Sequence, residues 1–313
     1  MNQTILIVAD KRDFHAAAVS EALKKRGEKV EWIDFTDLTE SCHMSLSIEQ
    51  QPNAKIISSS GHPVELSEVK TIWWRRPKSP QENSELDDDT RNFVHGEWEH
   101  FLESFEAFVP GVKWVNRPYA NRIANRKGFQ LTSAKEAGLR IPNTLMTNDP
   151  SAVRSLADRG IPLVYKRIGG APRPITATKE LLPSDLNRLD SLTQCPAIFQ
   201  ERIEASMDIR VTAIGHDLYA AEIDSQSGSS QLDWRFDHSV PFRPHSLDQK
   251  TSNSIRKVME KLGICYGAFD LRLTPEGEYV FLEVNPSGQF LFIELLTEIP
   301  LTEHMAAYLS LSK

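Results

Sequence analysis

The stretch from Ala268 to Asn285 constrains the fold of this chain more than any other. Two runs of alternating apolar residues flank Pro275-Glu276-Gly277-Glu278, a composition typical of a turn, so we predict an antiparallel hairpin. If Thr274 faces Tyr279 across the turn, apolar residues meet on one face of the hairpin. The facing pairs are then Phe269 with Val284, Leu271 with Leu282 and Leu273 with Val280. This face is therefore predicted to be buried core.

The opposite face of the predicted hairpin is polar. The same register sets Asp270 against Glu283, and Asn285 projects from their face because it lies two residues beyond Glu283. Two facing carboxylates repel each other unless a cation lies between them or one of them is protonated. Oxygen ligands of this kind suit Mg²⁺, which proteins usually share with substrate phosphates. The alternative is an exposed sheet face on which Arg272 neutralises the acids, and the pattern leaves both open.

Composition bounds the size and class of the protein. A chain of 313 residues corresponds to two or three domains, at roughly 100–200 residues per domain. Its net charge of −7 offers no general attraction to nucleic acid or to an anionic membrane, so neither is an expected partner. Three distant cysteines, Cys42, Cys195 and Cys265, fit neither a disulfide framework nor a metal clamp. The apolar run Ile5–Ala9 is too short for a signal peptide or a membrane span, and we expect a cytoplasmic protein.

The order of the predicted elements indicates an α/β fold in three parts. Thr4–Phe35 alternates strand, helix and strand, and a long predicted helix over Thr90–Val109 ends at Pro110-Gly111. We therefore predict an open α/β N-terminal domain over residues 1–115. A small central α+β subdomain over residues 116–196 and a C-terminal antiparallel-sheet subdomain over residues 197–313 follow it. The hairpin with the polar face belongs to the last of these.

Four cationic side chains are candidates for binding an anionic group. Lys127 lies near the start of a predicted helix, and Lys166 lies on a predicted strand just before Gly169-Gly170. A glycine pair lets backbone N–H groups approach an anion closely. Arg210 and Arg235 carry planar guanidinium groups that suit phosphate. Each of the four also fits an ordinary surface position, because most lysines and arginines are solvated.

An extended segment, Phe199-Gln200-Glu201-Arg202-Ile203, includes the end of a predicted strand. A segment that leaves a sheet offers main-chain N–H and C=O groups to a flat purine base. Asp208, a few residues further on, is a candidate partner for ribose hydroxyl groups. These residues alone do not establish a nucleotide site.

In their order along the chain, these residues resemble the ATP-grasp superfamily over about Asn121 to Pro286. Within it, Asp208-Ile209-Arg210-Val211 and Asp233-Trp234-Arg235 resemble a branch that includes protein polyglutamate ligases and ribosomal-peptide maturases. Two further motifs are similar to those of microviridin-type macrocyclases of the graspetide class: Ile72-Trp73-Trp74-Arg75-Arg76-Pro77 and Asn285-Pro286-Ser287-Gly288-Gln289-Phe290. Ordinary strand packing is the alternative for the two tryptophans, and an exposed pair is the alternative for Arg75-Arg76. The segment Gly169-Gly170-Ala171-Pro172-Arg173-Pro174 departs from the family, because two prolines stand where many relatives have glycine.

The resemblance implies an ATP-grasp fold, ATP and Mg²⁺ as cofactors, and a role for each candidate residue. The implied Mg²⁺ ligands are Asp270, Glu283 and Asn285. The implied phosphate-binding residues are Lys127 and Lys166, the implied ribose-binding residue is Asp208, and adenine is expected to bind the main chain of Gln200, Glu201, Arg202 and Ile203. The implied catalytic residues, which steady the transferred phosphoryl group or an acyl phosphate, are Arg210 and Arg235.

The function that the resemblance implies is ATP-driven cyclisation of a ribosomally made precursor peptide. The peptide would carry a leader and a core with Thr, Ser or Lys and Asp or Glu side chains, which become joined by ω-ester or ω-amide bonds. A ligase that adds an amino acid or amine to a protein or small carboxylate would use the same site residues. A nucleotide-binding module without catalysis is a third class, and the complete set of Asp270, Glu283 and Asn285 argues against it. The sequence leaves a homodimer open.

Overall fold

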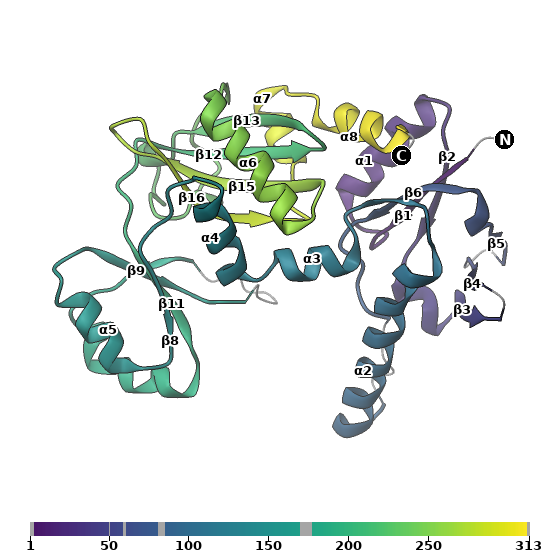
Figure 1. Cartoon of the computed structure of the whole chain (residues 1–313), viewed down its shortest axis with the longest axis horizontal. Helices are drawn as coiled ribbons and strands as arrows, with labels where there is room; N and C mark the ends of the chain where they lie inside the picture. Colours follow the sequence, from purple (N-terminus) through teal and green to yellow (C-terminus); the bar gives the residue numbers. More distant parts are fainter. Residues whose placement is uncertain (1–2, 50, 59–60, 81–84, 170–176, 312–313) are drawn as a thin grey trace. The chain divides into compact units, whose positions relative to one another are not determined.

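The computed structural model describes residues 3–49, 51–58, 61–80, 85–169 and 177–311. The chain folds into two compact units, and each unit is assembled from separate stretches of sequence (Figure 1). Unit 1 contains Met1–Ile123, Ile264–Tyr266 and Pro286–Lys313, and unit 2 contains Ala124–Gly263 and Gly267–Asn285. The C-terminal segment therefore completes unit 1, whereas the predicted parts 1–115, 116–196 and 197–313 follow one another along the sequence.

Unit 1 is built on a parallel sheet with the strand order β2-β1-β6-β7. The strands are β1 (Thr4–Val8), β2 (Lys29–Ile33), β6 (Val69–Trp74) and β7 (Lys113–Val115). Helix α1 (Phe14–Lys25) connects β1 to β2, which confirms the predicted β-α-β unit. Asp13 caps this helix by accepting a hydrogen bond from the Ala16 amide at 3.0 Å. Every residue of β1 is buried, as expected for a central strand of a parallel sheet.

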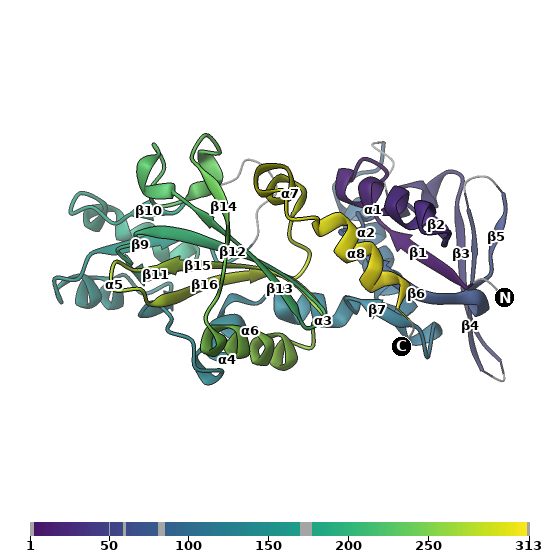
Figure 2. The ribbon, with the colours of Figure 1, turned by 90° about the horizontal axis from the view of Figure 1, so that it is seen from above.

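The other elements of unit 1 surround this sheet. A small antiparallel sheet contains β3 (His43–Ile48), β4 (Pro52–Ile57) and β5 (Pro63–Val64). The predicted helix over Thr90–Val109 forms as α2 (Asp88–Ser104), which continues into the 3₁₀ turn η3 (Phe105–Phe108). The C-terminal segment contributes α7 (Leu291–Thr297) and α8 (Leu301–Ser310), and α8 packs against α1 (Figure 2).

The core of unit 1 contains an aromatic cluster around Trp74. The centroid of its ring lies 5.4 Å from that of Phe35, 6.5 Å from Phe105 and 6.1 Å from Trp114. Trp73, the preceding residue on β6, is also buried. Because side chains alternate along a strand, the two tryptophans lie on opposite faces of the sheet and both pack as core residues.

Unit 2 contains two sheets, of which the first has the strand order β10-β9-β11-β8. Its strands are β8 (Thr144–Thr147), β9 (Leu163–Lys166), β10 (Lys179–Glu180) and β11 (Ala197–Glu201). Helix α5 (Pro150–Ala157) and the 3₁₀ segment η4 (Asp185–Gln194) pack on it. They enclose an apolar cluster that contains Val153, Leu189, Leu192 and Phe199.

The second sheet of unit 2 has five strands in the order β14-β13-β12-β15-β16. They are β12 (Met207–Ile214), β13 (Asp217–Ile223), β14 (Phe242–His245), β15 (Tyr266–Leu273) and β16 (Tyr279–Asn285). Helix α3 (Pro118–Ala124) leads the chain into unit 2. Helices α4 (Lys127–Glu136) and α6 (Gln249–Leu262) pack together on one side of this sheet (Figure 1, Figure 2). The opposite face of the sheet is left for polar residues.

The β15–β16 hairpin confirms part of the predicted register. The predicted pairs Asp270 with Glu283 and Phe269 with Val284 are present. Beyond them the prediction is wrong by one residue, because the pairs are Leu271 with Phe281, Arg272 with Val280 and Leu273 with Tyr279. A β-bulge causes the difference: Leu282 is an extra residue opposite the step from Asp270 to Leu271. Thr274 accordingly does not face Tyr279, and its amide donates to the Glu278 carbonyl at 3.0 Å.

Candidate functional site

The polar face of the five-stranded sheet brings the predicted acidic residues together. Asp270 on β15 lies opposite Glu283 on β16, and Asn285 follows two residues later on the same strand. Arg210 on β12 donates from Nη1 to both carboxylate oxygens of Asp270, each at 2.9 Å. Burial raises the pKa of the Asp270 carboxyl group, and the positive charge of Arg210 offsets this rise only in part. Asp270 and Arg210 are therefore a buried, mutually dependent pair.

Glu283 is surrounded by three cations. Lys127 Nζ, at the start of α4, lies 2.6 Å from Glu283 Oε2, and Arg235 Nη1 lies 3.7 Å from Glu283 Oε1. Burial opposes ionisation of Glu283, but the charges of Lys127, Lys166 and Arg235 outweigh it and lower its pKa to about 2. Lys166 lies at the end of β9. Burial lowers the pKa of Lys166, and the negative charge of Glu283 only partly opposes this effect. Four of the predicted site residues thus share one electrostatic cluster.

Arg235 is held in place by Asp233. Its Nε and Nη2 atoms lie 2.7 and 2.6 Å from the two carboxylate oxygens of Asp233, which is itself buried. This hydrogen-bonded pair raises the pKa of Arg235, so the guanidinium group stays charged. Trp234, between them in sequence, packs its ring 5.9 Å from the guanidinium carbon of Arg210. The Asp233-Trp234-Arg235 motif therefore holds Arg235 in place and sets an aromatic ring beside Arg210.

The residues present fit a hard divalent cation that is shared with phosphate. Asp270, Glu283 and Asn285 offer only oxygen donors, which Mg²⁺ prefers. Within the described ranges, no cluster contains three or more His, Cys, Asp or Glu side chains placed to hold a metal. Two carboxylates and one amide leave most of an octahedral shell to be filled, and phosphate oxygens and waters usually fill it.

A cleft next to this cluster is formed by residues of both sheets of unit 2. The residues that line it are Pro142, Val164, Lys166, Thr178, Gln200, Glu201, Arg202, Ile203, Leu232, Arg272 and Leu282. The predicted adenine-binding segment is therefore one wall of a cleft that also contains Lys166. Lys166 connects the cleft to the acidic pair through its interaction with Glu283.

Part of the main chain of the predicted adenine-binding segment already forms hydrogen bonds within the protein. The amides of Glu201 and Arg202 donate to the carbonyls of Asn143 and Pro162 at 2.9 and 2.8 Å. In the part of the chain that the structure describes, the Ile203 amide forms no hydrogen bond. Of these three N–H groups, the one at Ile203 is thus available to a ring nitrogen of a purine.

The side chains of this segment point to protein partners. Gln200 donates from Nε2 to Thr144 Oγ1 at 2.9 Å, and Arg202 pairs with Glu180 at 3.1 Å. Any contact of Gln200 or Arg202 with a base would therefore come from the main chain, as the sequence predicts.

Asp208 lies beside the cleft, with Arg272 as its partner. Asp208 is almost fully buried, and its Oδ1 accepts a hydrogen bond from Arg272 Nε at 3.1 Å. Burial raises the pKa of Asp208 in spite of the charge of Arg272. Arg272 also donates to the Ile203 carbonyl at 2.9 Å. Of Asp208 and Arg272, Arg272 is the one that lines the cleft in the described structure. The ribose role of Asp208 stays a prediction.

The residues of the cleft that sequence reasoning did not assign to the site include Leu282, Leu232 and Thr178. The predicted register assigned Leu282 to the apolar core face, and the β-bulge turns it toward the cleft instead. Leu232 and Thr178 lie in loops without a recognisable motif. The glycine segment is a separate case, because Gly170 to Thr176 lie outside the described residues, and the predicted phosphate loop is among them.

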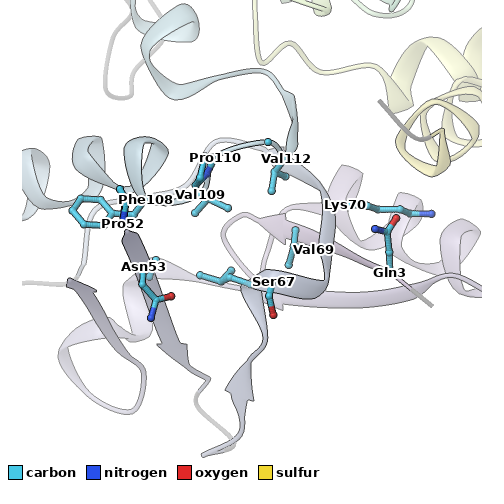
Figure 3. Close-up of a pocket in the computed structure, with 13 residues that line it drawn as sticks. Gln3, Pro52, Asn53, Ser67, Val69, Lys70, Phe108, Val109, Pro110 and Val112 are labelled. Atoms are coloured by element: carbon cyan, nitrogen blue, oxygen red, sulfur yellow. The ribbon is translucent and has the colours of Figure 1, made fainter. Parts of the chain in front are cut away.

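A second hollow lies in unit 1, with a volume of about 600 Å³ (Figure 3). Gln3, Val69 and Val112, which lie at or just before the first residues of β1, β6 and β7, help to line it. Ligands of open parallel sheets bind at the carboxyl ends of the strands, so this end is not the expected one. None of the predicted site residues lines it.

Comparison with known proteins gives a consistent result. Residues 4–122 match the model of the MvdD pre-ATP grasp domain. The macrocyclase MdnC of Microcystis aeruginosa MRC, whose structure contains the precursor peptide MdnA, is 28% identical with a TM-score of 0.89, covering 99% of this chain and 100% of its own. A Chryseobacterium gregarium RiPP-associated ATP-grasp ligase, in complex with ADP and a leader and core peptide, is 26% identical with a TM-score of 0.88, covering 98% of this chain and 96% of its own. The macrocyclase MdnB of Microcystis aeruginosa MRC is 26% identical with a TM-score of 0.83, covering 99% of this chain and 100% of its own.

Two negative findings accompany these matches. No curated protein sequence matches the chain. Every helix in the described part of the chain is too short or too polar to cross a lipid bilayer.

The matches extend over both units and therefore over the acidic pair, the cations and the cleft. The predicted α/β architecture is confirmed by the likeness to these ATP-grasp structures. The chain has an ATP-grasp fold, its residues 4–122 match the model of the MvdD pre-ATP grasp domain, and over its whole length it resembles the ribosomal-peptide macrocyclases.

Proposed function

We propose that this protein is an ATP-dependent ligase that cyclises a ribosomally made precursor peptide. The observation that carries the proposal is the full-length match to a macrocyclase whose structure contains its precursor peptide, at a TM-score of 0.89. The facing Asp270 and Glu283, ringed by Lys127, Arg210 and Arg235, supply the charges that such a reaction needs. The peptide would carry a leader and a core with Thr, Ser or Lys and Asp or Glu residues, and the reaction would take place in the cytoplasm.

The chemistry follows from the low reactivity of a carboxylate. A side-chain carboxylate of the peptide attacks the γ-phosphorus of ATP, which gives an acyl phosphate and releases ADP. A hydroxyl or amine of the same peptide then attacks the acyl carbon, loses its proton and displaces inorganic phosphate. The product is an ester or amide ring, and the peptide has lost one water. Phosphoryl transfer of this kind needs mainly positioning and neutralisation of charge.

The residues of unit 2 divide this work. We propose that Lys127 and Lys166 bind the phosphates and that Asp270, Glu283 and Asn285 hold Mg²⁺, which when bound neutralises charge on the transferred group. Lys127, whose Nζ lies 2.6 Å from Glu283 Oε2, would exchange this contact for a phosphate oxygen when the nucleotide binds. The purine would occupy the cleft, with its ring nitrogen on the Ile203 amide and its face against Leu282.

The two arginines act on the reacting groups from fixed positions. Arg235, held by Asp233 through Nε and Nη2, would offer its Nη1 group to the transferred phosphoryl oxygen. Arg210 would keep Asp270 oriented while adding positive charge to the same face. Asp208 would reach the ribose at the end of the cleft where Arg272 lies.

Ring closure on a precursor peptide tests this proposal. The purified protein is incubated with ATP, Mg²⁺ and a Thr/Asp/Glu-rich precursor, and mass spectrometry follows the loss of one water per ring. We expect water loss to accompany ADP release. ADP release that occurs only when a free amino acid or amine is added, with no water loss from the peptide, would establish the alternative ligase instead. No ADP release under either condition would leave a nucleotide-binding module.

A further inference from the structure

The main chain that follows Asn285 is bound by side chains from distant parts of unit 1. The guanidinium group of Arg75 donates from Nη1 to the carbonyls of Ser287 and Gly288, the latter at 2.9 Å. The hydroxyl group of Tyr266 donates to the same Gly288 carbonyl at 2.7 Å. Two successive carbonyls are held in this way, beginning two residues after a predicted Mg²⁺ ligand.

Asn116 holds the carbonyl that comes before them. Its Nδ2 lies 2.9 Å from the Pro286 carbonyl oxygen and 2.8 Å from that of Tyr266. Its Oδ1 accepts from the amides of Cys265 and Tyr266 at 2.8 and 2.9 Å. Asn116 is 2% exposed, so these bonds are shielded from water. One side chain thus joins the residues at the start of the β15–β16 hairpin to the residue that follows it.

Arg75 is held in an environment that disfavours a charged side chain. It is 1% exposed, its Nε lies 3.4 Å from Asp13 Oδ2, and within the described residues its Nη2 forms no hydrogen bond. An apolar residue of similar size would fill this space without the desolvation penalty of a guanidinium group. What an apolar residue does not supply is a donor for the carbonyls of Ser287 and Gly288.

Arg76 also contacts the main chain after Asn285, and its own backbone is strained. Its φ of 47° lies in the left-handed region, which is uncommon for residues other than glycine. Its Nε donates to the Ser287 carbonyl at 2.6 Å. Strained backbone of this kind clusters at functional sites. Burial at Arg75 and strain at Arg76 therefore serve one short segment of main chain.

We infer that Arg75 and Asn116 are positioning residues of the ligation reaction. With Tyr266 they form what we name the anchor, which holds the three carbonyls after Asn285 and would thereby position the side-chain oxygen of Asn285 for Mg²⁺. No member of the anchor needs to touch nucleotide, metal or peptide. This inference rests on the proposed function, because it requires Mg²⁺ and ATP to bind at Asp270 and Glu283. The inference also assigns a role to the Arg75-Arg76 motif, which takes no part in the nucleotide site.

The test separates metal binding from nucleotide binding and from folding, in the full-length protein. Arg75→Lys keeps the charge but loses the planar group that serves two carbonyls. Asn116→Asp keeps Oδ1 and loses the donor to Pro286, and Tyr266→Phe removes a single hydroxyl group. Electron paramagnetic resonance measures Mn²⁺ affinity in the presence of a non-hydrolysable ATP analogue. Fluorescence measures the affinity for that analogue without metal, and thermal unfolding reports the fold.

We expect Mn²⁺ affinity to fall by roughly 10-fold or more in Arg75→Lys and Asn116→Asp, the usual effect of changing a residue that orients a metal ligand. A smaller fall is expected in Tyr266→Phe, because Arg75 still holds the Gly288 carbonyl. Affinity for the metal-free analogue should be unchanged in all three. Arg12→Met, which removes an exposed arginine of unit 1, is the control and should change neither affinity.

Wild-type Mn²⁺ affinity in the folded variants would overturn the inference. Parallel losses of metal and analogue affinity that follow the loss of folded protein would also overturn it, because they indicate a purely structural role. If Arg75→Lys or Asn116→Asp does not fold, Tyr266→Phe decides between these results. These measurements need no peptide. A wild-type protein that binds Mn²⁺ with the analogue but closes no ring would refute the proposed function without refuting the inference about the anchor. A wild-type protein that binds no Mn²⁺ with the analogue would refute both.

Discussion

At the scale of single residues, the two predicted carboxylate ligands have different partners. Asp270 is paired with Arg210, whose side chain is 6% exposed. Of the three cations around Glu283, the two in ion-pair contact are more exposed, Lys127 at 20% and Arg235 at 41%. Removing one member of a buried pair leaves the other charge without compensation, which typically costs about 3–5 kcal/mol. Where the partner reaches solvent, water replaces the lost contact and the cost is far smaller.

Asp270→Asn and Glu283→Gln should therefore abolish ATP turnover alike and differ in stability. Asp270→Asn is expected to lower the free energy of unfolding by about 3 kcal/mol. Glu283→Gln is expected to lower it by less, because Lys127 and Arg235 can turn to solvent, although three cations lose the charge that they stabilise. ADP release at saturating Mg²⁺ measures turnover, and urea unfolding measures stability. Glu278→Gln, on the exposed turn of the same hairpin, is the matched control. Full ADP release by both variants would remove these carboxylates from the metal site.

Arg235 is predicted to act on charge that develops during phosphoryl transfer. Lysine cannot reproduce the two contacts of Arg235 with Asp233, so Arg235→Lys loses its fixed direction. We expect kcat to fall more than KM for ATP rises, as happens when an interaction is made mainly in the transition state. Steady-state kinetics of ADP release measures both, with Arg243→Lys on β14 as an exposed control. A change confined to KM would reassign Arg235 to ATP binding.

At the scale of elements, the β15–β16 hairpin separates what the sequence predicts from what it cannot. The acidic pair was predictable because charged and apolar residues alternate strictly around Asp270 and Glu283. The bulge was not, because Val280, Phe281 and Leu282 are all apolar, and a run of three apolar residues does not reveal where an extra one is inserted. One inserted residue is enough to exchange the faces of all residues beyond it.

The partners of the site residues were equally beyond prediction. Arg210 binds Asp270 and Arg272 binds Asp208, across 60 and 64 positions of sequence. Local patterns identify which side chains are charged and which face of a strand they share. They do not specify which strands become neighbours, and the order of the five strands decides these pairs.

The bulge leads to a prediction for the nucleotide cleft. Leu282→Ala removes apolar surface against which the purine is proposed to pack. Because this contact is the same in the ground state and the transition state, KM for ATP should rise while kcat stays unchanged. A loss of about 1–2 kcal/mol corresponds to a rise of roughly 5–30-fold. Leu295→Ala, an exposed leucine on α7, is the control for ADP-release kinetics. An unchanged KM in Leu282→Ala would exclude the purine from this wall of the cleft.

At the scale of the whole molecule, the interleaving of the two units could not be predicted. The sequence of α8 indicates an amphipathic helix whose apolar residues must be buried, and Leu301, Met305, Ala306 and Leu309 are indeed fully buried. Nothing in that pattern names the core that receives them. Packing against α1, at the other end of the chain, is decided by the complementary shapes of two distant surfaces.

Recognition of the peptide is also a property of the whole molecule. A precursor peptide without structure of its own is costly to order, so a maturase is expected to bind a leader segment and let the core sample the reacting site. Leader removal should lower ring closure strongly, and leader added as a separate peptide should restore part of it. Loss of water is measured by mass spectrometry on full-length precursor, core alone, and core with separate leader. Equal rates on all three would contradict leader-dependent maturation and favour a ligase for free amino acids or amines.

The discontinuous units also have a consequence for synthesis on the ribosome. Domains usually fold in the order in which they emerge, the N-terminal one first. Here the first strands of unit 1 emerge early, but α1, which contacts β2, lacks its contacts with α8 until that later helix appears. Unit 2 has all of its strands once residue 285 has emerged. Unit 1 therefore cannot complete its packing before the last strand of unit 2 has been made, and until then the apolar surface of α1 that α8 covers stays unpaired.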